Sequence, residues 1–308
     1  MIDHLHIKNF MCFKELEIPT LKRVNLIAGK NNSGKTTLLD AVRILRSDGS
    51  NSVINDILFA RNATFGFNKQ NKHLILINRN SKSNEFSINN FNLNISEHKS
   101  DDRTTDLLRS FDEIDRLKLE KEYLHDELVY VTFHSKYEDM THLWENIVLT
   151  PKEDDVYEII KDSIQPDLIR MDVGREIVRV RLKDTEKPVP LGTLGDGVYR
   201  ILLIALSLAN AQNSILLIDE LELGLHYSAL EKLWNMIFKY AQKWDIQVFA
   251  TTHSQDVLRT FHYVADDEKY INDAQYIRLQ INRKGENEAI LFDGERLRES
   301  LELQLEIR

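Results

Sequence analysis

The sequence has one cysteine, no long apolar run and no excess of positive charge. Cys12 has no partner for an intrachain disulfide, which favours a reducing compartment. No apolar run approaches the roughly 18 residues of a membrane-spanning helix, and residues 1–13 are too polar for a signal peptide. The sequence therefore predicts a cytoplasmic protein without membrane contact.

Acidic residues outnumber basic ones in this chain of 308 residues, and the net charge is −9. This balance argues against a surface covered with DNA-binding charge, because phosphate contacts need clustered Lys and Arg. It leaves room for a local DNA contact or for contact through a partner. The histidines form no H-E-x-x-H zinc motif, and Cys12 has no second thiol for a zinc site.

What the sequence does contain is a succession of short apolar strands and longer helices. Strands are predicted over 24–28, 128–133, 178–182, 215–218 and 247–250, and helices over 36–45, 198–209 and 227–242. Their alternation predicts an α/β fold with a mostly parallel central sheet flanked by helices. We expect a single domain over 1–308, with an N-terminal antiparallel β lobe and phosphate loop (1–46), a variable insertion (47–126), a motif-bearing part (127–262) and a C-terminal extension (263–308).

The insertion differs in composition from the rest of the chain. Twelve asparagines lie between Asn51 and Asn94, which is typical of turns and exposed loops. Strands are expected over 74–77 and 91–95, and a charged helix over 102–126. The insertion is a candidate surface for a partner, and a solvated insertion without a binding role is the alternative.

One segment matches the phosphate-loop pattern G-x-x-x-x-G-K-[ST] at every fixed position, between a predicted strand and a predicted helix. Its glycines permit close backbone approach, and its N–H groups would face nucleotide phosphates. Lys35 would neutralise phosphate charge, and Thr36 would hold Mg²⁺. The nucleotide-binding residues predicted here are Gly29, Lys30, Asn31, Asn32, Ser33, Gly34, Lys35, Thr36 and Thr37.

Two later strands end in polar residues that suit ATP hydrolysis. Asp219 and Glu220 follow the apolar run 215–218, where Asp219 can hold Mg²⁺ and Glu220 can activate the attacking water. His253 ends the next strand, where it could donate a hydrogen bond to the γ-phosphate. Taken alone, an acidic pair can merely end a strand, and a histidine there can be an ordinary surface residue. The intact phosphate loop upstream favours the catalytic interpretation for Lys35, Glu220 and His253.

These motifs, in this order, resemble the ABC-class ATPases, and more narrowly the OLD-like, RecF-like and SMC-like branch with its stand-alone bacterial AAA-type ATPases. The opening I-D-H-L-H-I-K-N-F-M-C-F is similar to the start of that branch, and D-E-L-E-L-G-L-H from Asp219 to its Walker B and D-loop. The resemblance covers about residues 1–46 and 127–262. It implies an ABC-ATPase-like head that binds ATP and Mg²⁺ and forms a homodimer on ATP.

The signature loop of that branch falls on 191–198 and departs from its pattern. A serine normally precedes the signature glycines and contacts the γ-phosphate on the opposite subunit. Here Gly195 and Gly197 flank Asp196, and the nearest hydroxyl is that of Thr193. The N–H groups of the two glycines could still meet a phosphate, which Asp196 would repel unless it turns away. The glutamine loop is also not found, since His134 and Ser135 follow the expected strand.

The resemblance leaves three functions to separate. The leading hypothesis is an ATPase that is coupled to a DNA-maintenance or anti-phage defence effector on a separate protein. A non-hydrolytic ATP switch that recruits a partner is the alternative, and a small-molecule P-loop kinase is the third. OLD-like proteins often carry a Toprim nuclease domain. The roughly 46 residues after His262 are too few for it, and no D-x-D metal motif occurs.

Overall fold

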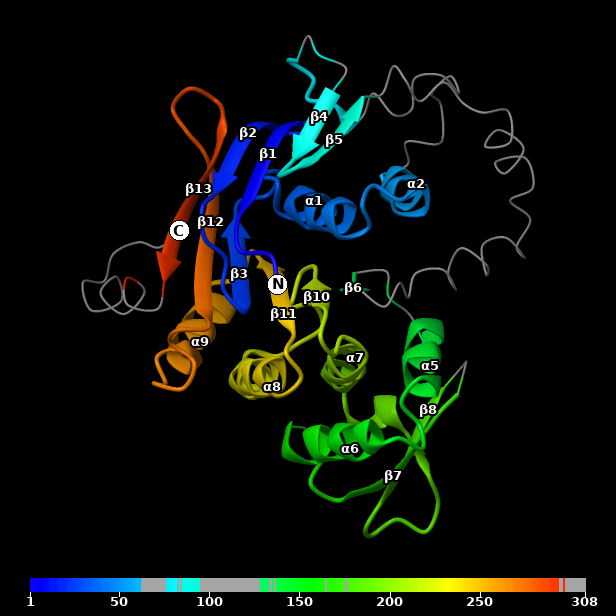
Figure 1. Ribbon diagram of the computed structural model, residues 1–308. Coiled ribbons are helices and arrows are strands. Elements are labelled where there is room, and N and C mark those ends of the chain that lie inside the picture. The colour runs from blue at the N-terminus through cyan, green and yellow to red at the C-terminus, as the bar shows by residue number, and fades with distance from the viewer. Residues whose placement is uncertain are drawn as a thin grey trace, which may run out of the picture.

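The centre of the molecule is a six-stranded sheet. The computed structural model describes residues 1–61, 76–81, 83, 85–94, 128–132, 135, 137–163, 165–174, 177–293 and 296. The strand order is β13-β12-β3-β11-β10-β6 (Figure 1). In chain order these strands are β3 (Val24–Gly29), β6 (Leu128–Val131), β10 (Ile215–Ile218), β11 (Gln247–Thr252), β12 (Ala274–Ile281) and β13 (Asn287–Asp293).

All strands of this sheet run parallel except β13, which pairs antiparallel with β12. Ile218 pairs with Val131 on one side and with Ala250 on the other, so β6, β10 and β11 end almost level. Thr252 pairs in turn with Ala28 at the end of β3. Because the carboxyl ends of parallel strands lie at one edge, the sheet brings its polar strand ends together there.

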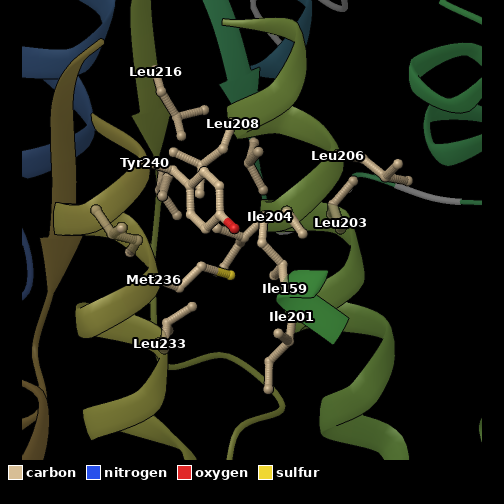
Figure 2. Packing of buried hydrophobic residues seen from close by; sticks show 14 of the residues in the cluster. Ile159, Ile201, Leu203, Ile204, Leu206, Leu208, Leu216, Leu233, Met236 and Tyr240 are labelled. Atoms are coloured by element: carbon tan, nitrogen blue, oxygen red, sulfur yellow. The ribbon is translucent and has the colours of Figure 1, made fainter. Parts of the chain in front are cut away.

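Helices cover the two faces of the sheet in separate cores, because successive strand residues point to opposite faces. Leu216 and Ile218 pack with α7 (Asp196–Asn210), α8 (Leu230–Lys243) and α9 (Gln255–Ala265). Figure 2 shows Ile204 and Leu208 of α7 facing Met236 and Tyr240 of α8. Helix α7 is apolar nearly all round because it also packs against α6 (Pro151–Ser163) on its other side.

The other face carries the phosphate-loop helix and an antiparallel sheet. Leu217 and Phe249 pack there with α1 (Lys35–Arg46) and α2 (Asn51–Ala60). A four-stranded sheet closes this core in the order β2-β1-β4-β5. Its strands are β1 (Leu5–Phe10), β2 (Phe13–Ile18), β4 (Glu85–Ile88) and β5 (Phe91–Asn94). Alternating burial along β1 and β2 turns their apolar side chains toward α1.

A third sheet lies beyond α6 and α7, at the bottom of Figure 1. It contains β7 (Leu168–Val173), β8 (Val178–Leu182) and β9 (Val189–Pro190), and α5 (Tyr137–Glu145) lies close to it. Two short 3-10 helices, Leu191–Leu194 and Tyr227–Ala229, precede α7 and α8. None of the helices in the described residues is long and apolar enough to cross a membrane.

The predicted fold class is confirmed, namely a mostly parallel sheet flanked by helices and an antiparallel N-terminal lobe. The predicted helix over 227–242 is corrected at its start, where a 3-10 turn capped by the His226 side chain precedes the α-helix from Leu230. Most of the insertion lies outside the described residues. This includes the predicted helix over 102–126, and positions 74, 75 and 95 of the two predicted strands.

Candidate functional site

The phosphate loop connects β3 to α1 and needs glycine at both of its fixed positions. Gly34 has a φ of 99°, and a Cβ there would lie 2.6 Å from Cζ of Phe13. A Cβ on Gly29 would lie 2.4 Å from the Leu279 carbonyl oxygen. Any larger residue would therefore push the loop off the strands behind it. The loop leaves Lys30, Asn31 and Asn32 exposed, and buries Ser33 and Thr37.

Lys35 folds back over its own loop. Its Nζ donates to the carbonyl oxygens of Gly29 at 2.9 Å and Lys30 at 3.2 Å. Burial lowers the pKa of Lys35, and the carboxylates of Asp219 and Glu220 oppose that shift. The ammonium group therefore lies in the loop, near the acidic residues that follow β10, where a phosphate group could replace the carbonyl contacts.

Thr36 and Asp219 are brought together although 183 positions separate them. Oγ1 of Thr36 donates to Oδ2 of Asp219 at 3.0 Å. Oγ1 of Thr251, on the neighbouring strand β11, donates to the other oxygen, Oδ1. Both carboxylate oxygens are thus held, which fixes the orientation of Asp219 at the tip of β10.

Glu220 has a left-handed backbone, with a φ of 51°. Such a conformation costs a residue with a side chain about 1–3 kcal/mol and persists only where neighbours hold it. Its N–H donates to Oγ1 of Thr251 at 2.9 Å, and its carbonyl oxygen accepts from Nη2 of Arg200 at 3.0 Å. The backbone of the predicted catalytic glutamate is therefore constrained from two sides.

Arg200 also contacts this cluster, and none of the motifs in the sequence includes it. It lies on α7, is only 8% exposed, and donates to the carbonyl oxygens of Thr132, Asp219 and Glu220. Burial lowers the pKa of this guanidinium, and the carboxylates of Asp219, Glu222 and Glu220 oppose the shift. One sequence signal was available, because Arg200 is the only charged residue in the apolar helix predicted over 198–209.

His253 lies directly after β11 and is bound to Glu222. Oε1 of Glu222 accepts from the His253 backbone N–H at 3.0 Å and lies 3.1 Å from Nδ1 of the ring. The ring itself is 56% exposed, whereas the Glu222 carboxylate is 15% exposed. Glu222 was not among the predicted site residues, although it stands in the D-E-L-E segment. In the structure, Glu222 holds both the backbone and the ring of His253.

The signature glycines lie at the start of α7. Gly195 has a φ of 115° and is the N-cap residue of the helix, where a glycine supplies no side-chain hydrogen bond. A Cβ on Gly197 would lie 3.2 Å from the Gly224 carbonyl oxygen. Gly197 therefore lies beside the loop that follows Glu220. The two signature glycines are not part of the hydrogen-bonded cluster of Thr36, Asp219 and Thr251.

The C-terminal hairpin also reaches the phosphate loop. Nδ2 of Asn287, at the start of β13, donates to the Ser33 carbonyl oxygen at 2.9 Å, 254 positions away in the chain. Leu279 of β12 lies behind Gly29. No motif marks Asn287 in the sequence, so its contact with the loop could not have been found from the sequence.

A family model described as "AAA domain, putative AbiEii toxin, Type IV TA system" matches residues 24–259. The chain is 22% identical to an ATP/GTP phosphatase of Helicobacter pylori, over 96% of its own length and 99% of the relative's. It is 46% identical to the DNA replication and repair protein RecF of Nitrosococcus oceani over 44 residues, 14% of this chain and 12% of that protein.

Among solved structures, the chain is similar to an Smc head bound to the C-winged helix domain of ScpA, with a TM-score of 0.54 and 14% identity. The match covers 97% of this chain and 99% of the Smc head. At this identity the likeness shows the fold. It confirms the resemblance to SMC-type heads that the motif order indicates.

Proposed function

Since the chain belongs to the AAA_21 family of P-loop ATPases, we propose that it binds Mg²⁺–ATP at the carboxyl edge of its central sheet and hydrolyses it. The cluster that joins Thr36, Asp219, Glu220 and Thr251 beside Lys35 carries this proposal. The nearly full-length similarity to an ATP/GTP phosphatase supports it.

Nucleotide phosphates fit the loop between β3 and α1. The close approach at Gly29 and Gly34 leaves no space for side chains, so the loop presents its backbone. Lys35 would exchange two carbonyl contacts for phosphate oxygens, which are charged and bind an ammonium group more strongly. Residues 29–37 thus supply the binding energy for the triphosphate.

The side chains of Thr36 and Asp219 carry oxygen atoms of the kind that bind Mg²⁺. A hydroxyl and a carboxylate oxygen already lie 3.0 Å apart, and Mg²⁺ prefers such oxygen ligands, with the remainder from phosphates and water. When bound, Mg²⁺ would neutralise part of the phosphate charge. Thr251 would keep Asp219 oriented for this purpose through its hydrogen bond to Oδ1.

Glu220 is the proposed general base. It would accept a proton from the water that attacks the γ-phosphorus, as the bond from that phosphorus to the leaving ADP oxygen breaks. His253 would hold the γ-phosphate through its ring, which Glu222 orients. Lys35 would stabilise the charge that develops on the phosphate oxygens.

ATP binding would also join two copies of the chain. In this arrangement Gly195 and Gly197 present the uncapped N-terminus of α7 to the γ-phosphate of the partner subunit. The dimer would signal to a separate effector protein in DNA maintenance or anti-phage defence. The description of the family as a toxin–antitoxin component and the ScpA-bound Smc head with a similar fold support an effector on another chain.

A non-hydrolytic switch that recruits a partner is the second candidate, favoured by the replacement of the signature serine by Gly195 and Asp196. Phosphate release by the purified chain separates the two functions. We expect many phosphates per chain from the wild type, and a rate about 10²–10⁴-fold lower from Glu220→Gln, since an amide cannot accept the proton. Release of at most one phosphate per wild-type chain would establish the switch instead.

A further inference from the structure

We propose that Arg200 is a positioning residue that holds Glu220 in its left-handed backbone conformation, so that helix α7 sets the position of the hydrolytic carboxylate. This inference rests on the proposed role of Glu220 as the general base. It assigns a function to a buried charge that the motifs leave unexplained.

The carbonyl groups of Asp219 and Glu220 point toward the same nitrogen of Arg200. In an extended strand, neighbouring carbonyls point to opposite sides. At the end of β10, however, the carbonyl oxygens of Asp219 and Glu220 both accept from Nη2 of Arg200, at 2.9 Å and 3.0 Å. The left-handed φ of Glu220 accompanies this convergence on a single nitrogen. Arg200 therefore stabilises the backbone conformation that the chain adopts directly after β10.

Burying the charged side chain of Arg200 costs free energy unless its N–H groups are hydrogen-bonded. A buried guanidinium needs hydrogen-bond acceptors, and within the described residues Nη1 and Nη2 of Arg200 donate to three backbone carbonyls. Nη1 takes the third of these, at Thr132, directly after β6. Arg200 thereby fastens the ends of two adjacent parallel strands to α7.

Helix α7 also links Arg200 to the signature loop. Residues three apart lie on the same face of a helix, so Gly197 and Arg200 face the same way. Gly197 contacts Gly224, in the loop after Glu220, while Arg200 binds Glu220 itself. A shift of the first turn of α7 would therefore be transmitted both to the backbone of Glu220 and to the loop at Gly224. The geometry of Glu220 would then depend on whether the signature loop is engaged.

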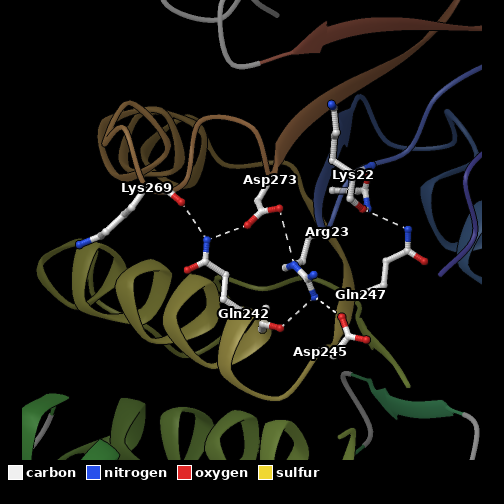
Figure 3. A network of polar contacts seen from close by, with 9 residues as sticks. Lys22, Arg23, Gln242, Asp245, Gln247, Lys269 and Asp273 are labelled. Carbon is white, nitrogen blue, oxygen red and sulfur yellow. Dashed lines mark hydrogen bonds and ion pairs between the residues drawn. The ribbon is translucent and has the colours of Figure 1, made fainter. Parts of the chain in front are cut away.

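Arg200→Lys tests the proposal, because a lysine keeps the charge but has no planar fork to reach two strand ends. We expect kcat to fall about 10–100-fold, with ADP affinity within about three-fold of the wild type. In a Glu220→Gln background, the same substitution should lower kcat by less than about two-fold, since the base is already lost. Arg23→Lys is the matched control (Figure 3). Arg23 also donates to a backbone carbonyl, that of Ala241, and binds carboxylates remote from the nucleotide loop.

Parallel losses of kcat and ADP affinity, or a full additional loss in the Glu220→Gln background, would overturn the proposal. A wild-type chain without turnover would refute the proposed function but leave the backbone role of Arg200 open to a second measurement. Glycine adopts left-handed angles without strain, so Arg200→Lys should lower the melting temperature less in a Glu220→Gly background than in the wild type. An equal decrease in both backgrounds, or no folded Arg200→Lys protein in either, would contradict the backbone role.

Discussion

The Glu222 carboxylate binds His253 twice, through the backbone N–H at 3.0 Å and through Nδ1 of the ring at 3.1 Å. Because a carboxylate only accepts hydrogen bonds, Nδ1 carries the proton in this contact, and Nε2 is the ring nitrogen left to face a ligand. To hold a phosphate, the ring must also donate a hydrogen bond from Nε2, which requires a proton on both ring nitrogens. Two acidic residues of one short segment thus take different tasks, since Glu220 is proposed to act on water and Glu222 binds the histidine.

This contact predicts graded effects at position 222. Glu222→Leu removes the acceptor and should lower kcat about 10–100-fold with little change in nucleotide affinity, because the histidine loses its orientation. Glu222→Gln keeps an oxygen that can accept from both His253 groups and should retain much more activity. Steady-state turnover and nucleotide titration of both variants provide the measurement. Equal losses in the two variants would mean that charge, and not orientation, is the contribution of Glu222.

Lys35→Ala should weaken ATP binding at least about thirty-fold, because a charge-assisted contact to phosphate contributes about 2 kcal/mol or more. The fold should be unaffected, since the hydrogen bonds of Lys35 within the described residues go to carbonyl groups of its own loop. Fluorescent-nucleotide titration together with thermal melting checks both statements. Lys14→Ala removes the same charge from an exposed pair with Glu286 and serves as the control. Tight binding by folded Lys35→Ala would refute the phosphate-loop assignment.

Glu220→Gln should accumulate as a dimer with Mg²⁺–ATP, because slow hydrolysis keeps the nucleotide between the two subunits. Light scattering should show about twice the monomer mass with ATP and the monomer mass with ADP. Adding Lys35→Ala to this variant should abolish dimer formation by preventing nucleotide binding. A Glu220→Gln chain that binds ATP but stays monomeric would rule out the dimer model and the trans role of Gly195 and Gly197.

His262 makes stability depend on pH. It is buried on α9, and burial lowers its pKa from 6.5 to about 4. The unfolded chain therefore binds a proton at a pH where the folded chain does not, and stability is lost as the pH falls from about 6.5 toward 4. We expect this residue alone to cost about 2 kcal/mol of unfolding free energy between pH 7 and pH 5.

Urea unfolding of wild type and His262→Leu at both pH values isolates this contribution, since every other titrating group is common to the two proteins. Leucine has a similar volume and does not titrate, so the variant should lose less stability than the wild type between pH 7 and pH 5. Identical losses in the two proteins would mean that His262 accepts a proton in the folded state without cost.

Much of the fold and part of the site could be predicted from the sequence because their signals are local. The glycines, Lys35 and Thr36 stand in one continuous loop, and Asp219 and Glu220 directly follow an apolar strand. A parallel sheet then brings such strand ends to one edge, whatever the details of packing. The catalytic roles of these residues remain predictions, to be decided by the variants described above.

Other contacts depend on how elements that are far apart in the sequence pack against each other. Arg200 meets Glu220 only because α7 packs across the ends of β6 and β10, and Asn287 reaches Ser33 because β13 returns beside the phosphate loop. Such contacts join residues up to 254 positions apart, and their geometry follows from the positions of the elements rather than from a pattern along the chain. The sequence by itself determined which groups could do the chemistry. The tertiary structure decided which buried side chains hold those groups in place.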